Sequence, residues 1–254
     1  MTDFTHRLDR IVTIDARPDV VFGFLSKTEY WARWWGQGST IDPTPGGAVR
    51  IRHPNGIEVH GEVIEVKPGA FLSFTYGNPT GTPIPLGGSR VEIRLDAIGR
   101  STRLHLTHHF ADVASRDEHV QGWRFQLSLF SNLVADTLHA DAGEKADAWF
   151  AVWANPDEAA RTRQLREIAA PDVRFRDRYS TLDGADDVLA HITAAQRFMP
   201  GVRLSREGAA RHCQGLALVD WTAAVNDQPR GRGTNCFAFD ADGRIVAVTG
   251  FWSM

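Results

Sequence analysis

Apolar and polar residues alternate along much of the first half of the chain, with the two-residue period of β-strands. The alternation begins at His6–Asp15, and the runs that follow are separated by turns such as Pro54-Asn55-Gly56. Two short helices are expected after the first strand, over Asp19–Leu25 and Glu29–Trp35. The further predicted strands cover residues 48–54, 57–66, 71–76, 90–95 and 102–110.

The last part of the first half shows the hydrophobic period of a helix. Val120, Trp123, Leu127 and Phe130 are spaced so that they share one face of a helix, which we expect over Ser115–His139. The first half therefore combines a sheet with a long closing helix.

The pattern changes after the polar segment Asp141–Lys145, which we take as a domain boundary. Two helices are expected first, then a short strand over Val173–Asp177, then a further helix. Four strand-like runs finish the chain, over residues 202–212, 216–226, 231–240 and 245–252. Because 254 residues is long for one core, we predict two α+β domains, residues 1–140 and 141–254.

Composition narrows the function classes. The net charge of −3 provides no field for nucleic acid or for an anionic membrane, and Arg161, Arg163 and Arg166 are expected on a solvated helix face. The first ten residues are polar, unlike a signal peptide, and no run of apolar residues has the length of a membrane span. Cys213 and Cys236 are expected to be buried free thiols, and a cytoplasmic location is expected.

The first half resembles a known superfamily in a series of short motifs, in the family's order over about residues 6–140. It is similar to the START-like (SRPBCC) ligand-binding proteins, and within them to the subgroup of the Hsp90 ATPase activator homologue. The resemblance implies a helix-grip fold, in which a curved antiparallel sheet and a long C-terminal helix enclose a hydrophobic cavity. The motifs are Ile14–Phe22, Trp34-Trp35-Gly36, Pro45-Gly46-Gly47, Gly61-Glu62-Val63, Pro68-Gly69, Phe74-Thr75-Tyr76, Ser89-Arg90-Val91 and Gly122-Trp123.

The second half, over about residues 145–254, resembles the SnoaL-like and ketosteroid-isomerase-like branch of the nuclear-transport-factor-2-like (NTF2-like) superfamily. The resemblance implies a cone-shaped α+β barrel, a fold that hosts enzymes such as polyketide cyclases and also non-enzymes. The motifs are Ala148–Trp153, Ala170–Asp177, Gly184 at the start of a helix, Phe239–Ile245 and Gly250-Phe251-Trp252.

The same resemblance implies roles for three residues. Asp177 matches the general base at the end of the first short strand, and a carboxylate facing aromatic helices would suit acid-base catalysis. Trp149 and Asn235 match the positions of the opposing hydrogen-bond donors, but neither side chain is a strong acid, so ketosteroid-type isomerisation would be weakened. The alternatives are an Asp177 paired with Arg176 or Arg178 at the surface, and structural roles for Trp149 and Asn235.

Four further residues of this domain are candidates. His191 is either a proton relay that faces the cavity or a structural helix histidine. Asp220 either faces the cavity or is solvated outside it, and Tyr179 and Trp221 are candidate ligand contacts.

In the first domain the ligand-binding candidates are aromatic. His108 shares a strand face with Leu104, Leu106 and Phe110, so it should point inward and either contact a ligand or bond within the protein. His105 and His109 should point outward. The candidate ligand contacts are Trp35, Phe74, Tyr76, His108 and Trp123.

Three functions remain open: an enzyme with Asp177 as base for isomerase, cyclase or hydrolase chemistry, a non-catalytic two-module binder or sensor of an apolar metabolite, and a chaperone-associated protein. An enzyme predicts two or more ionisable groups facing the cavity around Asp177, whereas a binder predicts one or two polar anchors. We expect a small apolar or aromatic ligand as partner, and no cofactor or metal, since zinc spacings and phosphate loops are missing from the sequence. The second-domain resemblance implies a homodimer through an open sheet face, with the first domain as the alternative contact.

Overall fold

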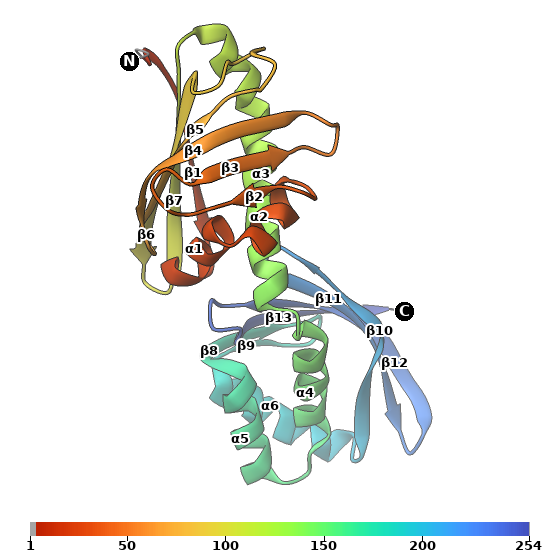
Figure 1. Ribbon diagram of the computed structural model, residues 1–254. Coiled ribbons are helices and arrows are strands. Elements are labelled where there is room, and N and C mark those ends of the chain that lie inside the picture. The colour runs from red at the N-terminus through yellow and green to blue at the C-terminus, as the bar shows by residue number, and fades with distance from the viewer. Residues whose placement is uncertain (1–3, 254) are drawn as a thin grey trace. The chain divides into compact units, whose positions relative to one another are not determined.

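The computed structural model describes residues 4–253 of the chain. Within them, Cα positions group into two compact units, one up to Val134 and one from Ala135 onward. The boundary lies inside helix α3 (Val113–Leu138), and the segment expected as a polar break forms the start of helix α4 (Ala142–Ala154) instead (Figure 1). Both units are α+β, with large sheets that are mainly antiparallel.

The first unit contains, over its described residues, a seven-stranded antiparallel sheet in the order β1-β7-β6-β5-β4-β3-β2. The short strand β2 is not apparent in the sequence pattern, because two residues are too few to show a period. The bounds are β1 His6–Ile14, β2 Thr40–Ile41, β3 Ala48–Arg52, β4 Glu58–Lys67, β5 Phe71–Tyr76, β6 Ser89–Ile98 and β7 Ser101–Phe110.

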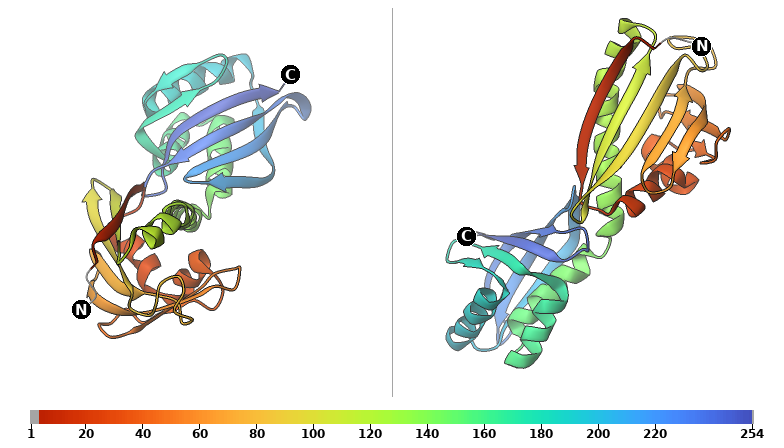
Figure 2. Two further views of the ribbon diagram at one scale, coloured as in Figure 1. Left: turned by 90° about the horizontal axis from the view of Figure 1, so that it is seen from above. Right: turned by 90° about the vertical axis from the view of Figure 1, so that its left-hand side faces the viewer.

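Helices α1 (Pro18–Ser26), α2 (Thr28–Trp35) and α3 cover one face of this sheet (Figure 2). The face is apolar because alternate residues of β7 point toward the helices, and His108 is fully buried among them, as expected. His105 and His109 point the other way, and their Nε2 atoms lie 3.1 Å from Asp96 Oδ2 and 3.3 Å from Glu92 Oε2 of β6.

The second unit is built on a six-stranded sheet, counted over the described residues, in the order β10-β11-β12-β13-β8-β9. Neighbouring strands are antiparallel except for β13 and β8, which run parallel. The edge strands β10 and β9 do not pair, so the sheet is open and the expected barrel is wrong. The bounds are β8 Ala169–Arg176, β9 Thr181–Asp183, β10 Val202–Cys213, β11 Leu216–Val225, β12 Gln228–Phe239 and β13 Ile245–Ser253.

Helices α4, α5 (Glu158–Ile168) and α6 (Ala185–Phe198) cover one face of the second sheet (Figure 2). Aliphatic and aromatic residues fill the core of the unit. Arg161 of α5 is only 2% exposed, which corrects the expectation of a solvated helix face. Its guanidinium donates to Thr193 Oγ1 at 2.7 Å and to Gln196 Oε1 at 2.9 Å, so it links α5 to α6.

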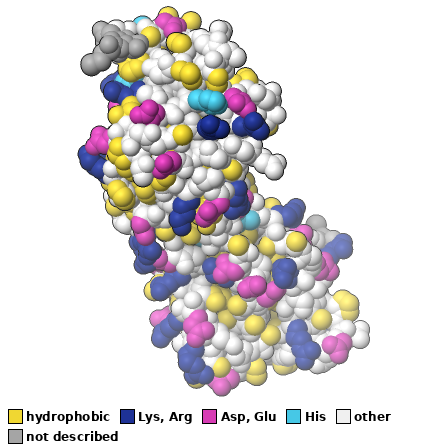
Figure 3. Space-filling view, viewed as in Figure 1, with side chains coloured by type: hydrophobic (Ala, Val, Ile, Leu, Met, Phe, Trp, Pro, Cys, Tyr) yellow, Lys and Arg dark blue, Asp and Glu magenta, His cyan; other side chains and the backbone are white. Residues whose placement is uncertain are grey.

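The charged residues on the surface are distributed as in an ordinary globular protein. On the face seen in Figure 3, acidic and basic side chains are interspersed and form no basic stripe. Both cysteines are free, but Cys213 is exposed and Cys236 only half-buried, so the expectation of buried thiols is wrong. Within residues 4–253, no helix combines the length and the apolar character that crossing a membrane requires.

Candidate functional site

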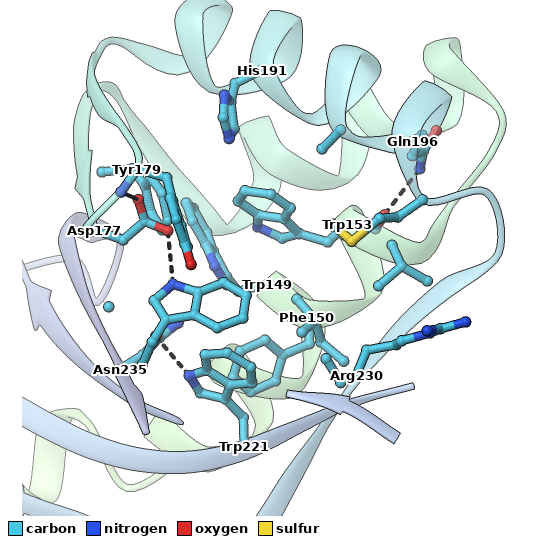
Figure 4. A pocket seen from close by; sticks show the side chains of 18 of the residues that line it. Trp149, Phe150, Trp153, Asp177, Tyr179, His191, Gln196, Trp221, Arg230 and Asn235 are labelled. Atoms are coloured by element: carbon cyan, nitrogen blue, oxygen red, sulfur yellow. Dashed lines mark hydrogen bonds between the residues drawn. The ribbon is translucent and has the colours of Figure 1, made fainter. Parts of the chain in front are cut away.

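A cavity of about 590 Å³ lies between the helices and the sheet of the second unit (Figure 4). This volume falls in the range of small-molecule sites, which are mostly apolar with a few polar groups. Aromatic and aliphatic side chains form most of its wall. The lining residues are Trp149, Phe150, Trp153, Phe175, Asp177, Tyr179, His191, Ala195, Gln196, Phe198, Met199, Val202, Leu204, Trp221, Ala223, Arg230, Asn235, Gly250 and Trp252.

Asp177 directly follows β8 and is half-buried in this wall. The backbone N–H of Tyr179 donates to Oδ1 at 2.8 Å, and the indole N–H of Trp252 donates to Oδ2 at 3.0 Å. Among the described residues Asp177 forms no ion pair, so the alternative of a surface pair with Arg176 or Arg178 does not hold. Two N–H groups therefore orient the carboxylate, and each oxygen keeps a free lone pair for a ligand.

Trp221 packs against Trp252 in the cavity wall, and a glycine leaves room for the Trp221 ring. Trp221 and Trp252 are both in register with Gly233 of the intervening strand β12, and their rings meet edge to face with centroids 5.0 Å apart. A Cβ at position 233 would lie 2.7 Å from the Trp221 ring. The glycine therefore permits the aromatic wall.

Asn235 is 6% exposed and lies on β12 beside Gly250 of β13. Its Oδ1 accepts the indole N–H of Trp221 at 2.9 Å, which orients the amide and leaves its NH₂ group without a partner among the described residues. Trp149, from α4, is 1% exposed and lines the same cavity. The structure thus brings the three residues of the resemblance to one cavity.

His191 reaches the cavity from α6. Its Nε2 lies 3.2 Å from Ser180 Oγ, and its ring packs edge to face against Trp153, with centroids 5.7 Å apart. Tyr179 is 69% exposed and also lines the cavity, with its ring 5.5 Å from that of Trp252. Both candidates therefore face the space beside Asp177 (Figure 4).

Asp220 does not face the cavity, which corrects its place among the catalytic candidates. Strand alternation points Val219 and Trp221 inward, so the residue between them points outward. There its carboxylate accepts the Thr234 hydroxyl at 2.5 Å and pairs with Arg211 at 3.3 Å.

Several lining residues were missed in the sequence. His191 and Ala195 of α6 and Met199 directly after it line the wall, and their spacing of four residues marks one helix face and could have revealed it. Gln196 donates to the carbonyls of Trp153 and Asn155 at 2.9 and 2.8 Å and accepts from Arg161, so it holds the helices of the wall together. The missed residues are Phe150, Trp153, Phe175, Ala195, Gln196, Phe198, Met199, Val202, Leu204, Ala223, Arg230, Gly250 and Trp252.

The first unit has a cavity of its own, of about 420 Å³, between α3 and the sheet. Trp35, Tyr76 and Trp123 line it, as expected. Phe74 does not, because it is fully buried against Trp31, with ring centroids 5.8 Å apart. The other lining residues are His53, Pro54, Asn55, His119, Gly122, Phe125, Gln126 and Leu129.

His108 also lies behind this wall, which corrects its assignment as a ligand contact. Its Nε2 is 2.9 Å from Ser89 Oγ, and its Nδ1 accepts the indole N–H of Trp123 at 3.0 Å. Burial holds the pKa of His108 well below its ordinary value, and His119 and His109 lower it further. Both nitrogens are occupied within the protein.

Two histidines that do line the first cavity were missed. Burial lowers the pKa of His53, and nearby His119 lowers it further. The pKa of His119 is lowered by burial too, although the hydrogen bond from its ring to the Ser115 carbonyl, at 2.7 Å, opposes that shift.

Among the described residues, no three histidine, cysteine or acidic side chains gather closely enough to hold a metal ion. The site is a largely apolar cavity with an oriented carboxylate in its wall, in a two-unit α+β chain. The family model described as "Activator of Hsp90 ATPase homolog 1-like protein" (AHSA1) matches residues 15–135. The first unit thus contains an AHSA1-like domain, which covers slightly less than half of the chain.

Solved structures similar to this chain come from both of the groups that the sequence resembles. One is described as a putative isomerase of the SnoaL-like family from Agrobacterium tumefaciens, at 24% identity, covering 46% of this chain and 99% of that one, with a TM-score of 0.43. An AHSA1-like protein from Rhizobium etli is 28% identical over 51% of this chain and 81% of its own, with a TM-score of 0.42. The Aha1 dimer from Colwellia psychrerythraea is 17% identical over 49% and 93%, with a TM-score of 0.43. No curated protein matches the chain.

Proposed function

We propose that the second unit binds a small, largely apolar or aromatic molecule and that Asp177 removes a proton from it. The observation that carries this proposal is a half-buried carboxylate, held by two N–H donors, in the wall of an otherwise aromatic and aliphatic cavity. Such a cavity excludes water from the bound molecule, and a positioned base in it contributes roughly 10²–10⁴ in rate.

The groups around Asp177 favour catalysis over binding alone. His191, Tyr179 and Arg230 also line the cavity, so it holds more ionisable groups than an apolar binder needs as anchors. The NH₂ group of Asn235 supplies a hydrogen-bond donor for the negative charge that proton removal creates. His191, which contacts Ser180, is a second polar group that a bound molecule could contact.

We assign the second unit to the SnoaL-like branch on its sequence motifs and on the position of Asp177 after the first strand of the sheet. Its open sheet departs from the closed barrel expected of that branch. Trp149 and Asn235 stand where the resembled ketosteroid isomerases have a phenol and a protonated carboxylic acid, which are stronger hydrogen-bond donors. The reaction we propose is therefore a proton transfer on a substrate that is more acidic than a ketosteroid.

Binding without turnover is the second candidate function. It is favoured by the neutral character of the Asn235 amide and of the Trp149 indole, since neither can donate a proton to a product. In that case Asp177 would be a polar anchor, and the ligand would leave unchanged.

The test uses 5-nitrobenzisoxazole, a small aromatic molecule. When a base removes its ring C–H proton, the N–O bond breaks and a coloured cyanonitrophenolate is released, so a carboxylate base in an apolar cavity is detected directly. We expect the full chain to accelerate this reaction and Asp177→Asn to lower the rate by about 100-fold or more.

Asp220→Asn is the matched control, because it removes a carboxylate of the same unit that lies outside the cavity. Ala195→Phe, which fills the cavity from α6, should abolish the rate and also the binding of the neutral fluorophore N-phenylnaphthylamine. If Asp177→Asn reacts as fast as Asp220→Asn while the fluorophore still binds, the catalytic proposal fails and the binder remains.

A further inference from the structure

The pairing of β12 with β11 is irregular at one residue, Arg230. Ala223 pairs with Gly231 and Ala224 pairs with Pro229, so Arg230 is an extra residue in β12, a β-bulge. The hairpin that precedes it turns tightly at Asn226 and Asp227, both with positive φ. Bulges often lie beside active sites, where they redirect a side chain.

The bulge changes the side of the sheet that Arg230 faces. Along β12 the odd-numbered residues Gly233, Asn235 and Phe237 are buried, and the even-numbered residues alternate with them on the outer face. Regular alternation would place Arg230 on that outer face together with Arg232. Instead, Arg230 lines the cavity and Arg232 does not.

Arg230 is exposed to solvent on one side while it lines the cavity, and it brings a positive charge there. Among the described residues it forms neither an ion pair nor a side-chain hydrogen bond. Asp177 lies at the opposite end of the pocket (Figure 4). Between the two ends the wall is apolar, with Val202, Leu204 and Ala223 on neighbouring strands.

We propose that Arg230 determines specificity in this cavity by binding an anionic group, a carboxylate, sulfonate or phosphate, at the end of the ligand remote from Asp177. The ligand class is thus an apolar or aromatic body with an anionic group at one end and the reacting C–H at the other. The guanidinium suits such a group because it offers several N–H donors in one plane. This inference rests on the proposed function, since it concerns the same cavity.

The test compares two fluorescent probes that differ in one charge. Anilinonaphthalenesulfonate carries a sulfonate, and N-phenylnaphthylamine has the same rings without it. Ala195→Phe fills the second-unit cavity, so the probe fluorescence that is lost in this variant measures binding to that cavity. We expect Arg230→Gln to weaken binding of the anionic probe about five- to tenfold and to leave the neutral probe unchanged.

Arg232→Gln is the matched control, because it removes the same charge from the same strand at a position outside the cavity. It should leave the affinity for both probes unchanged. If Arg230→Gln and Arg232→Gln weaken the anionic probe equally, Arg230 acts only through general charge and the inference is wrong, while binding of the neutral probe still supports the proposed function. If neither probe binds in a manner sensitive to Ala195→Phe, both proposals are overturned.

Discussion

The indole N–H of Trp123 donates a hydrogen bond to Nδ1 of His108 across 3.0 Å, and this contact determines the tautomer of the imidazole. The hydroxyl of Ser89 donates to the Tyr76 carbonyl at 2.8 Å, so its oxygen accepts from Nε2 of His108. The imidazole is therefore neutral, with its proton on Nε2. A second proton on Nδ1 would face the Trp123 N–H, which agrees with the low pKa that burial gives this group.

We predict that His108→Leu lowers the free energy of unfolding by about 2–4 kcal/mol, because it leaves the buried Trp123 N–H without its acceptor and Ser89 without a donor. Urea denaturation followed by tryptophan fluorescence measures this change. His105→Leu, on the partly exposed face of the same strand, should cost less than about 1 kcal/mol. Equal losses in the two variants would contradict a structural role for the His108 hydrogen bonds.

A second prediction concerns acid sensitivity. Burial lowers the pKa of His139 to about 4, with further contributions from His212 and Lys145. In the unfolded chain this histidine takes up its proton near its ordinary pKa of 6.5, whereas the native state resists protonation until about pH 4. Its contribution to stability is therefore complete above about pH 6.5 and is lost as the pH falls toward 4, by at most about 1.4 kcal/mol per pH unit.

His139→Gln should reduce this acid sensitivity. Urea unfolding of the wild type and of the variant at about pH 7.5 and about pH 4.5 gives the comparison, and the loss of stability between the two pH values should be smaller in the variant. An unchanged loss would show that His139 does not contribute to the acid sensitivity.

A third prediction uses the glycine between the two polar groups of the site. A Cβ at position 250 would lie 3.1 Å from Asn235 Oδ1 and 3.3 Å from Asp177 Cβ, closer than nearly all such contacts, so both side chains would have to shift. Because a small misplacement of a catalytic group is costly, we expect Gly250→Ala to lower the rate with 5-nitrobenzisoxazole about tenfold.

Gly122→Ala provides the control, because a Cβ there meets nothing within 4 Å and the residue lies in helix α3. It should leave the rate unchanged and stabilise the helix by about 0.5–1 kcal/mol. Rates that fall equally in the two variants would contradict the positional argument.

Local patterns predicted the elements well and their pairing poorly. The alternation along residues 102–110 identified strand β7 and the inward side of His108. The open sheet of the second unit was not predicted, because the local pattern shows neither that the edge strands β10 and β9 stay unpaired nor that β8 runs parallel to β13. The hydrophobic period of a strand indicates which of its faces is buried, but it does not indicate which other strand it pairs with.

The same limit applies to the site. Asp177 could be proposed because it matches the position of the general base in the resembled branch, at the end of a short apolar strand. Arg230 could not, since a bulge in strand pairing reverses the side that alternation predicts. Arg161 was placed in solvent because arginine is usually exposed, whereas the hydrogen bonds that its guanidinium donates to Thr193 and Gln196 compensate its burial. In both cases the neighbouring strand or helix decides the environment, and the pattern within the element itself does not show it.

The bond between Trp252 and Asp177 joins residues 75 positions apart, and it has a consequence for the order of folding. The hairpins β10–β11 and β11–β12 need only short loops to close, whereas the pairing of β13 with β8 joins residues that are 73 to 76 positions apart. Contacts with long loops form late, because their closure entropy is compensated only when much of the structure is in place. A partly folded second unit would therefore hold most of its strands and lack an oriented carboxylate, so that ligand binding would become a signal of completed folding.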